Sequence, residues 1–215
     1  MSHTEPTRDY RVVVLISGSG SNLQALLDDQ MNYRVVLVIA DRLSAYGLQR
    51  AEDARVLARA IPLRAPRNPE VREAWEVEVA DAIAAAQPDL IVMAGWMRVM
   101  SSAFIERFSG QIINQHPALL PDDGAPVYTL SDHSTVVAIR GAHAVRDALR
   151  LGVPMTGCTV HWVTPEVDVG PALARAEVAV LPDDDEDSLH ERIKTHERRL
   201  IVDVVRHLAA TTLPE

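Results

Sequence analysis

Short apolar runs rich in β-branched residues alternate with helical patterns through more than half of the chain. The apolar runs lie at 11–16, 35–40, 61–65, 89–94 and 111–114. The helical patterns between them lie at 23–27, 47–60, 69–86 and 101–108. This alternation is typical of a parallel sheet with helices on both faces, joined by right-handed crossovers. The sequence therefore predicts an α/β fold with a Rossmann-like, doubly wound, mostly parallel sheet.

The second half of the chain departs from this alternation. Residues 122–140 form a long loop-like stretch with one weak strand-like run at 135–139. The later elements are predicted as a helix at 143–150, an antiparallel strand pair at 157–163 and 172–180, and a long amphipathic helix at 183–208. We therefore expect the sheet to end in an antiparallel C-terminal strand pair, followed by a closing helix.

Length and composition restrict the classes of protein that this sequence can belong to. With 215 residues, 47% hydrophobic and 24% charged, the chain suits one domain, predicted over 11–210 with 122–140 as an inserted loop, a flexible leader at 1–10 and a tail at 211–215. No apolar run approaches the roughly 20 residues of a membrane span. The single Cys158 and the lack of a secretory signal favour a cytoplasmic protein. A net charge of −9 disfavours nucleic acid and membrane partners, so an anionic ligand needs a local site.

A glycine-rich turn follows the first predicted strand and leads directly into a helix. Gly18 and Gly20 allow a close approach of the backbone, and Ser21 and Asn22 add polar groups at a helix N-terminus whose amides bind anions well. Leu23 stands where a dinucleotide fingerprint has its third glycine, and the turn also lacks the Lys-Ser/Thr pair of a P-loop. The turn therefore favours a monophosphate. The alternative is a tight turn with a serine cap and no ligand.

An amide and an imidazole lie at the end of another predicted parallel strand. Because strand residues alternate, Asn114 and His116 are expected to point to the same side of the sheet. Such a pair suits acyl transfer, in which the amide stabilises an oxyanion and the histidine handles a proton. Asp168, in a turn with Gly170 and Pro171, would favour the imidazolium if it lay near His116. The alternatives are a structural strand end and an ordinary turn residue.

Other polar and apolar side chains are more ambiguous. Arg98 follows a predicted strand beside Trp96, Met97 and Met100, which either line a flat aromatic pocket or belong to the core.

The last predicted helix and the strand predicted at 157–163 add four further candidates. Lys194 and Glu197 are three residues apart on that helix and on their own favour a surface ion pair. His161 is interpreted as an inner-face residue that could support the site, and Cys158 as a small buried hydrophobe.

Together these segments resemble the phosphoribosylglycinamide formyltransferase family. The resemblance runs from about Arg11 to about Leu208 and rests on residues 16–24, 94–98, 114–121, 157–161 and 167–171. The Asn-x-His-Pro-x-Leu-Leu-Pro pattern at 114–121 is shared by the wider group of enzymes that use 10-formyltetrahydrofolate. Within that group, the glycine turn narrows the choice of formyl acceptor.

The resemblance implies a role for each site residue. Asn114, His116 and Asp168 would form the formyl-transfer site. The acceptor N1-(5-phospho-D-ribosyl)glycinamide would bind at Gly20, Ser21 and Asn22 through its phosphate, with Lys194 and Glu197 reaching phosphate and ribose instead of forming an ion pair. The folate would be bordered by Met97, Arg98, Val99, Met100, Thr164, Pro165, Glu166 and Val167, with Arg72 and Arg98 near its glutamate tail.

The implied reaction transfers the formyl group of 10-formyltetrahydrofolate to the glycinamide amine in de novo purine biosynthesis. Asn114 and a protonated His116 would stabilise the oxyanion, and Asp168 would position a water that relays the proton, without a metal. We expect small-molecule substrates and a monomer or homodimer. The alternatives are a formyltransferase acting on another amine, such as an amino-sugar nucleotide, and a non-catalytic nucleotide-binding module that uses Asp41 for a ribose.

One stretch departs from the family pattern. Gly141 and His143 follow the Leu-Leu-Pro segment only after residues 122–140, and Ile139-Arg140 replaces the aromatic-Pro pair usual before that glycine. The longer loop is interpreted as a lid, an oligomer contact, a determinant of substrate preference or a tolerated surface insertion.

Overall fold

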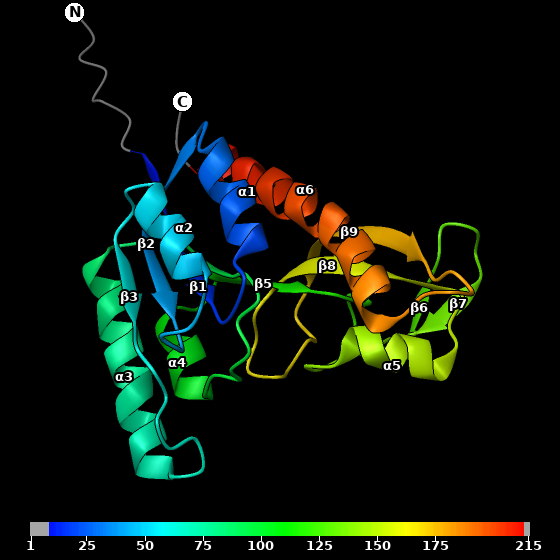
Figure 1. The fold of residues 1–215 in the computed structure, drawn as a ribbon, viewed down its shortest axis with the longest axis horizontal. Helices are drawn as coiled ribbons and strands as arrows, with labels where there is room; N and C mark the ends of the chain where they lie inside the picture. The colour runs from blue at the N-terminus through cyan, green and yellow to red at the C-terminus, as the bar shows by residue number, and fades with distance from the viewer. Residues whose placement is uncertain (1–8, 213–215) are drawn as a thin grey trace, which may run out of the picture.

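A seven-stranded sheet forms the centre of the computed structural model, which describes residues 9–212 (Figure 1). The strands, in their order across the sheet, are β3 (Ala58–Ala60), β2 (Tyr33–Ala40), β1 (Tyr10–Ile16), β4 (Leu90–Met93), β5 (Ile112–His116), β8 (Met155–Trp162) and β9 (Ala172–Ala179). The first five strands along the chain pair in parallel, whereas β8 pairs antiparallel with β5 and with β9. The predicted α/β sheet with an antiparallel C-terminal pair is confirmed.

Helices cover both faces of the sheet (Figure 1). On one face lie α1 (Ser21–Asp29), α2 (Gly47–Asp53) and the long α6 (Glu186–Thr212), and on the other lie α3 (Pro69–Ala85) and α4 (Ser102–Arg107). Alternation along β1 feeds both cores, because Val12 and Val14 pack toward α1 and α6 while Val13 and Leu15 pack toward α3. The short α5 (Ala144–Leu151) packs beside α6.

Two predictions on the β2–β3 side of the sheet are wrong. The helix expected over 47–60 ends at Asp53, because Arg55 adopts a left-handed φ of 57° and turns the chain back toward the sheet. The strand expected at 61–65 is instead Ala58–Ala60, which pairs with the end of β2. Pro62 has no N–H with which to continue the ladder, so the neighbouring Ile61 and Leu63 are buried without forming a strand.

The inserted loop folds into a hairpin of β6 (Val127–Thr129) and β7 (Thr135–Val137). Only the second strand is expected from the sequence, since three residues are too few for the first to show an alternating pattern. Leu119, Leu130 and Val136 make a small apolar cluster beneath the hairpin. Ser131 Oγ donates a hydrogen bond of 2.8 Å to Glu177 on β9. The insertion is therefore anchored to the edge of the main sheet.

The ends of the domain differ slightly from expectation. β1 begins at Tyr10, inside the expected leader, and α6 extends to Thr212, inside the expected tail. The remaining leader and tail residues, 1–8 and 213–215, lie outside the described residues. α6 begins later than predicted because Asp185 accepts a hydrogen bond from Ser188 N at 2.8 Å and so caps the helix. Among residues 9–212, no helix is both long and apolar enough to span a bilayer.

Gly157 on β8 provides a test of the packing that holds the C-terminal strand pair. A Cβ at this position would lie 2.0 Å from Ala176 O and 2.8 Å from Leu119 Cδ2. We expect Gly157→Ala to destabilise the fold by about 1–3 kcal/mol in urea titrations, because backbone cannot yield to the added methyl group. Gly18→Ala is the matched control, since a Cβ at Gly18 meets nothing within 4 Å. Equal stability of the two variants would contradict this close packing.

Candidate active site

A cavity of about 500 Å³ opens at the carboxyl ends of β1, β4 and β5. The strand order reverses at this point, because β2 and β3 lie on one side of β1 whereas β4 and β5 lie on the other. Doubly wound sheets bind their ligands at such a switch point. The walls are the glycine turn, the segments after β4, β5 and β8, the residues before α5, and α6. All residues assigned to the site from the sequence line this cavity, with the exception of Arg72.

The glycine turn presents a helix N-terminus to the cavity. Gly20 is the N-cap of α1 with a φ of 70°, and no side chain among the described residues caps this helix. The serine cap considered from the sequence is therefore absent from the described part of the chain, and the first-turn amides remain available to a ligand. A Cβ on Gly20 would lie 2.7 Å from Gly47 Cα, so the turn is packed closely against the start of α2.

Asn22 and Glu197 join this turn to the closing helix. Asn22 Nδ2 donates a hydrogen bond of 3.1 Å to Glu197 Oε2, and the Glu197 side chain is only 5% exposed. Burial raises the pKa of Glu197, while the hydrogen bond from Asn22 and the nearby Lys194 oppose this. Lys194 Nζ pairs with Glu191 at 2.8 Å. The expectation of a Lys194–Glu197 ion pair from helical spacing is therefore wrong, because each side chain has another partner.

Asn114, His116 and Asp168 come together at the end of β5. Asn114 and His116 alternate along the strand and share a side of it, as expected. His116 Nδ1 lies 3.5 Å from Asp168 Oδ2, which also accepts a hydrogen bond of 2.8 Å from Gly141 N. Asp168 has a φ of 55° in a turn where Gly170 approaches Trp162 O so closely that a Cβ would lie 1.9 Å away. The contact between this carboxylate and His116 is one that the sequence alone does not reveal.

His161 is a site residue that the sequence identifies only as a possible support. It lies opposite Asn114 in the β5–β8 ladder, and its Nδ1 lies 2.9 Å from Trp162 O. Burial lowers the pKa of His161, so the ring is neutral with its proton on Nδ1. The bare Nε2 then accepts from Asn114 Nδ2 at 3.2 Å. This bond uses one N–H of the Asn114 amide and leaves the second for a ligand.

The insertion contributes directly to the site, which the sequence does not predict. Ile139 O lies 2.8 Å from His116 Nε2, so both ring nitrogens of His116 face hydrogen-bond acceptors. Arg140 Nε donates to Asp168 O at 3.2 Å. The Ile139-Arg140 pair, which replaces the aromatic-Pro pair of the resembled family, therefore contacts both the imidazole and the Asp168 turn.

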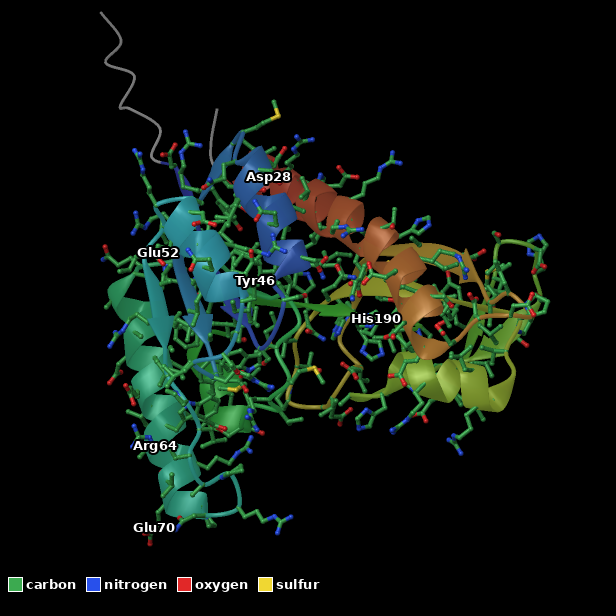
Figure 2. The ribbon with its side chains drawn as sticks, in the orientation of Figure 1. Asp28, Tyr46, Glu52, Arg64, Glu70 and His190 are labelled. Carbon is green, nitrogen blue, oxygen red and sulfur yellow. The ribbon has the colours of Figure 1, made fainter. Side chains whose placement is uncertain are left out.

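The wall formed by residues 96–100 is partly core and partly open. Trp96 and Met100 are buried, and Trp96 stacks on Trp75 with ring centroids 5.9 Å apart. Met97 and Val99 are the apolar side chains of this segment that remain exposed. Residues 164–167 line the same cavity, and His190 faces it from α6 (Figure 2).

The two arginines expected near the glutamate tail have partners within the protein. Arg98 Nε lies 2.5 Å from Asp41 Oδ2. Arg72 lies outside the cavity lining, donates to Val99 O and pairs with Glu76 at 3.4 Å. Arg72 therefore contacts the 96–100 wall at Val99, and its predicted contact with the glutamate tail stays a prediction. The buried Asp41 carboxylate is also occupied by Arg42, so it is not free to bind a ribose.

The described residues contain no group of three or more His, Cys, Asp or Glu side chains that could hold a metal ion. Cys158 is fully buried, as expected, and burial raises the pKa of its thiol to about 12. The side chains described above can supply hydrogen bonds, proton transfer and charge stabilisation to the cavity.

Comparison with known proteins agrees with this geometry. Residues 10–205 match the protein family described as formyl transferase. The phosphoribosylglycinamide formyltransferase of Mycobacterium tuberculosis H37Rv is 44% identical over 207 residues, covering 95% of this chain and 87% of the relative. That of Escherichia coli K12 is 35% identical over 193 residues, covering 88% and 82%. The crystal structure of glycinamide ribonucleotide transformylase 1 from Symbiobacterium toebii has a TM-score of 0.82 at 37% identity and covers 98% of this chain and 94% of that one.

Proposed function

The chain belongs to the formyl transferase family, and from this premise we propose that it takes the formyl group from 10-formyltetrahydrofolate through Asn114, His116 and Asp168. Its activity is that of a phosphoribosylglycinamide formyltransferase of de novo purine biosynthesis. The observation that carries the site assignment is the convergence of the Asn114 amide, the His116 imidazole and the Asp168 carboxylate on the cavity that the glycine turn also lines.

The proposed reaction is a direct transfer. The glycinamide nitrogen forms a bond to the formyl carbon, the bond from that carbon to the donor nitrogen breaks, and the proton lost by the amine reaches the donor nitrogen. The second N–H of the Asn114 amide, left free by His161, would donate to the formyl oxygen as it becomes negative. Asp168 orients His116 and, as we propose, positions the water that relays the proton.

His116 must change one hydrogen-bond partner for this reaction. Its Nε2 lies against Ile139 O at 2.8 Å, and we propose that the formyl oxygen takes this N–H as negative charge develops. Asp168 Oδ2, 3.5 Å from Nδ1, faces the opposite side of the ring and stabilises positive charge on it. Ile139 of the insertion thus supplies the carbonyl oxygen that the formyl oxygen would displace from His116 Nε2.

The acceptor phosphate is proposed to lie at the free amides of Gly20, Ser21 and Asn22, within reach of Lys194. The ribose would then lie toward Glu197. In a protein with a net charge of −9, this local positive site is what allows an anionic substrate to bind. The folate would lie between the exposed side chains of Met97 and Val99 and residues 164–167.

Lys194 offers a test of the phosphate site. We expect Lys194→Met to raise the KM for phosphoribosylglycinamide about tenfold or more with a small change in kcat, because a charge-assisted hydrogen bond to the phosphate is lost. Arg199→Met on the same helix is the matched control, since this cation is 86% exposed in an ion pair with Asp203 and lies outside the cavity lining. An equal rise in both variants would mean that net charge, not a phosphate contact, is responsible.

Ligand-dependent melting separates the transferase from a non-catalytic nucleotide-binding module. A ligand that binds only the folded state adds about 2.7 kcal/mol of stability at 100 times its Kd. We expect phosphoribosylglycinamide to raise Tm and NAD to leave it unchanged, because Asp41 is already paired with Arg98 and Arg42. A rise with NAD alone would overturn the proposed acceptor site.

A further inference from the structure

Arg140, the last residue of the insertion, joins two segments that are far apart in the chain. Its Nε donates a hydrogen bond of 3.2 Å to Asp168 O, and its Nη2 donates one of 2.8 Å to Ala125 O. The donors of a guanidinium form a rigid, planar fork, so the two bonds hold one carbonyl group in a set position relative to the other. Arg140 therefore ties the turn that carries Asp168 to the first part of the insertion.

The turn at Asp168 has a backbone conformation that needs such support. Asp168 has a left-handed φ of 55°, in a region that costs free energy for residues other than glycine unless neighbouring contacts hold it. Its buried carboxylate lies 3.5 Å from His116 Nδ1, and Oδ2 accepts a hydrogen bond of 2.8 Å from Gly141 N. A rotation of this turn would carry the carboxylate away from the imidazole.

The start of the insertion also contacts the segment that begins at Asp168. A Cβ on Gly124 would lie 2.8 Å from Val169 Cγ1, so the backbone of Gly124 packs directly against that side chain. Asp122 Oδ1 accepts a hydrogen bond of 3.0 Å from Ala172 N. Residues 122–125 at one end of the insertion and 140–141 at the other therefore meet on residues 168–172.

Arg140 acts on the site through Asp168 and not through a ligand. Asp168 and Gly141 line the cavity, whereas Arg140 and Ala125 lie outside its lining. The bond from Arg140 goes to the backbone carbonyl of Asp168, so both carboxylate oxygens stay available to other partners. Catalytic side chains must be held within about 0.5 Å of their productive geometry, which makes the orientation of this one turn decisive for the His116–Asp168 contact.

We propose that Arg140 is a positioning residue for formyl transfer, which holds the Asp168 turn in the orientation that sets the carboxylate against His116. This inference rests on the proposed function, because it takes Asp168 as the partner of His116 in the reaction. The insertion then belongs to the support of the reacting groups and is not merely a tolerated addition to the surface.

Arg140→Met is expected to lower kcat about tenfold or more and to leave both KM values within about twofold of wild type. The change removes both hydrogen bonds and lets the turn shift, and a small misplacement of a catalytic group is costly to the chemical step. The substrates are held by other walls of the cavity, so their binding should change little. A residue with only a structural role would lower Tm and leave the kcat of the folded protein unchanged.

Arg175→Met is the matched control for this experiment. Arg175 on β9 also holds the insertion through two hydrogen bonds, which it donates at 2.6 Å each to Leu120 O and Asp122 Oδ1. Neither bond reaches Asp168, and Arg175 lies outside the lining of the cavity. We therefore expect this variant to lower Tm at least as much as Arg140→Met and to leave kcat unaltered.

Steady-state formyl transfer from 10-formyltetrahydrofolate to phosphoribosylglycinamide by the full chain tests the proposal. The variants are Arg140→Met, Arg175→Met, Asp168→Asn and the double variant Arg140→Met/Asp168→Asn, each with a thermal melt. If Arg140 acts through Asp168, its loss should cost less than about twofold once the carboxylate is gone, so the double variant should match Asp168→Asn.

The outcomes separate this inference from the function on which it rests. A kcat of Arg140→Met within twofold of wild type, equal losses of kcat in the two arginine variants, or a further tenfold loss in the double variant would overturn the role of Arg140. No transfer by wild type, or a normal kcat in Asp168→Asn, would instead overturn the proposed function and this inference with it.

Discussion

Replacing His116 with alanine is expected to lower kcat by about a hundredfold or more, the usual contribution of one acid-base or oxyanion group. The change removes the only imidazole that lies within 3.5 Å of Asp168 Oδ2 among the described residues. Because the substrates are held mainly by other walls of the cavity, we expect the KM values to change much less than kcat. Steady-state kinetics with both substrates varied measures the two effects separately.

His207→Ala is the control for the His116 variant. His207 lies exposed on α6, outside the cavity, so this change should leave kcat unaltered. The His116 variant also loses its contact with Ile139 O, and a thermal melt shows whether the fold survives that loss. A folded His116→Ala protein with nearly normal kcat would remove His116 from the mechanism.

Asp168→Asn is expected to lower kcat by about a hundredfold while leaving the fold intact. Asparagine has nearly the same shape, tolerates the left-handed φ of 55° found here, and can still accept the hydrogen bond from Gly141 N. What it loses is the negative charge 3.5 Å from His116 Nδ1. The loss of activity would therefore report the charge, since the turn itself is preserved.

The His116→Ala/Asp168→Asn double variant shows whether the two residues act as one unit. Residues that act together are strongly non-additive, so the double variant should be about as slow as the slower single variant. Asp203→Asn, an exposed change on α6, is the control for the loss of one carboxylate. Independent, multiplicative losses in the double variant would contradict the proposed pairing of His116 with Asp168.

The local sequence predicts those parts of the fold where pattern and packing agree. The strands β1, β2 and β4 are runs rich in β-branched residues, and the structure buries most of each run on both faces, as a parallel sheet requires. The sequence does not place β3 of the parallel part correctly and does not predict β6 of the hairpin, and each of these strands has only three residues. Pairing with the end of β2 decides the position of β3, and the apolar cluster beneath the hairpin holds β6. These are tertiary effects that leave little pattern in the chain.

The sequence predicts those candidate site residues that lie close to one another in the chain. Asn114 and His116 needed only strand alternation, and the glycine turn needed only its place before a helix. The partners that complete the site come from distant segments. Asn22 and Glu197 are 175 positions apart, and His116 and Ile139 are 23 apart. The register of β5 against β8, which places His161 opposite Asn114, also exists only in the folded chain.

Formyl transfer by the purified protein tests the central claim most directly. Release of tetrahydrofolate from 10-formyltetrahydrofolate is followed with phosphoribosylglycinamide, with an amino-sugar nucleotide and with no acceptor, in wild type and in His116→Ala. We predict release only with phosphoribosylglycinamide, formation of its formylated product by mass spectrometry, and a rate of both that is about a hundredfold or more lower in the variant. Release without an acceptor, or only with the amino-sugar nucleotide, would contradict the assignment of this cavity as a glycinamide formyl-transfer site.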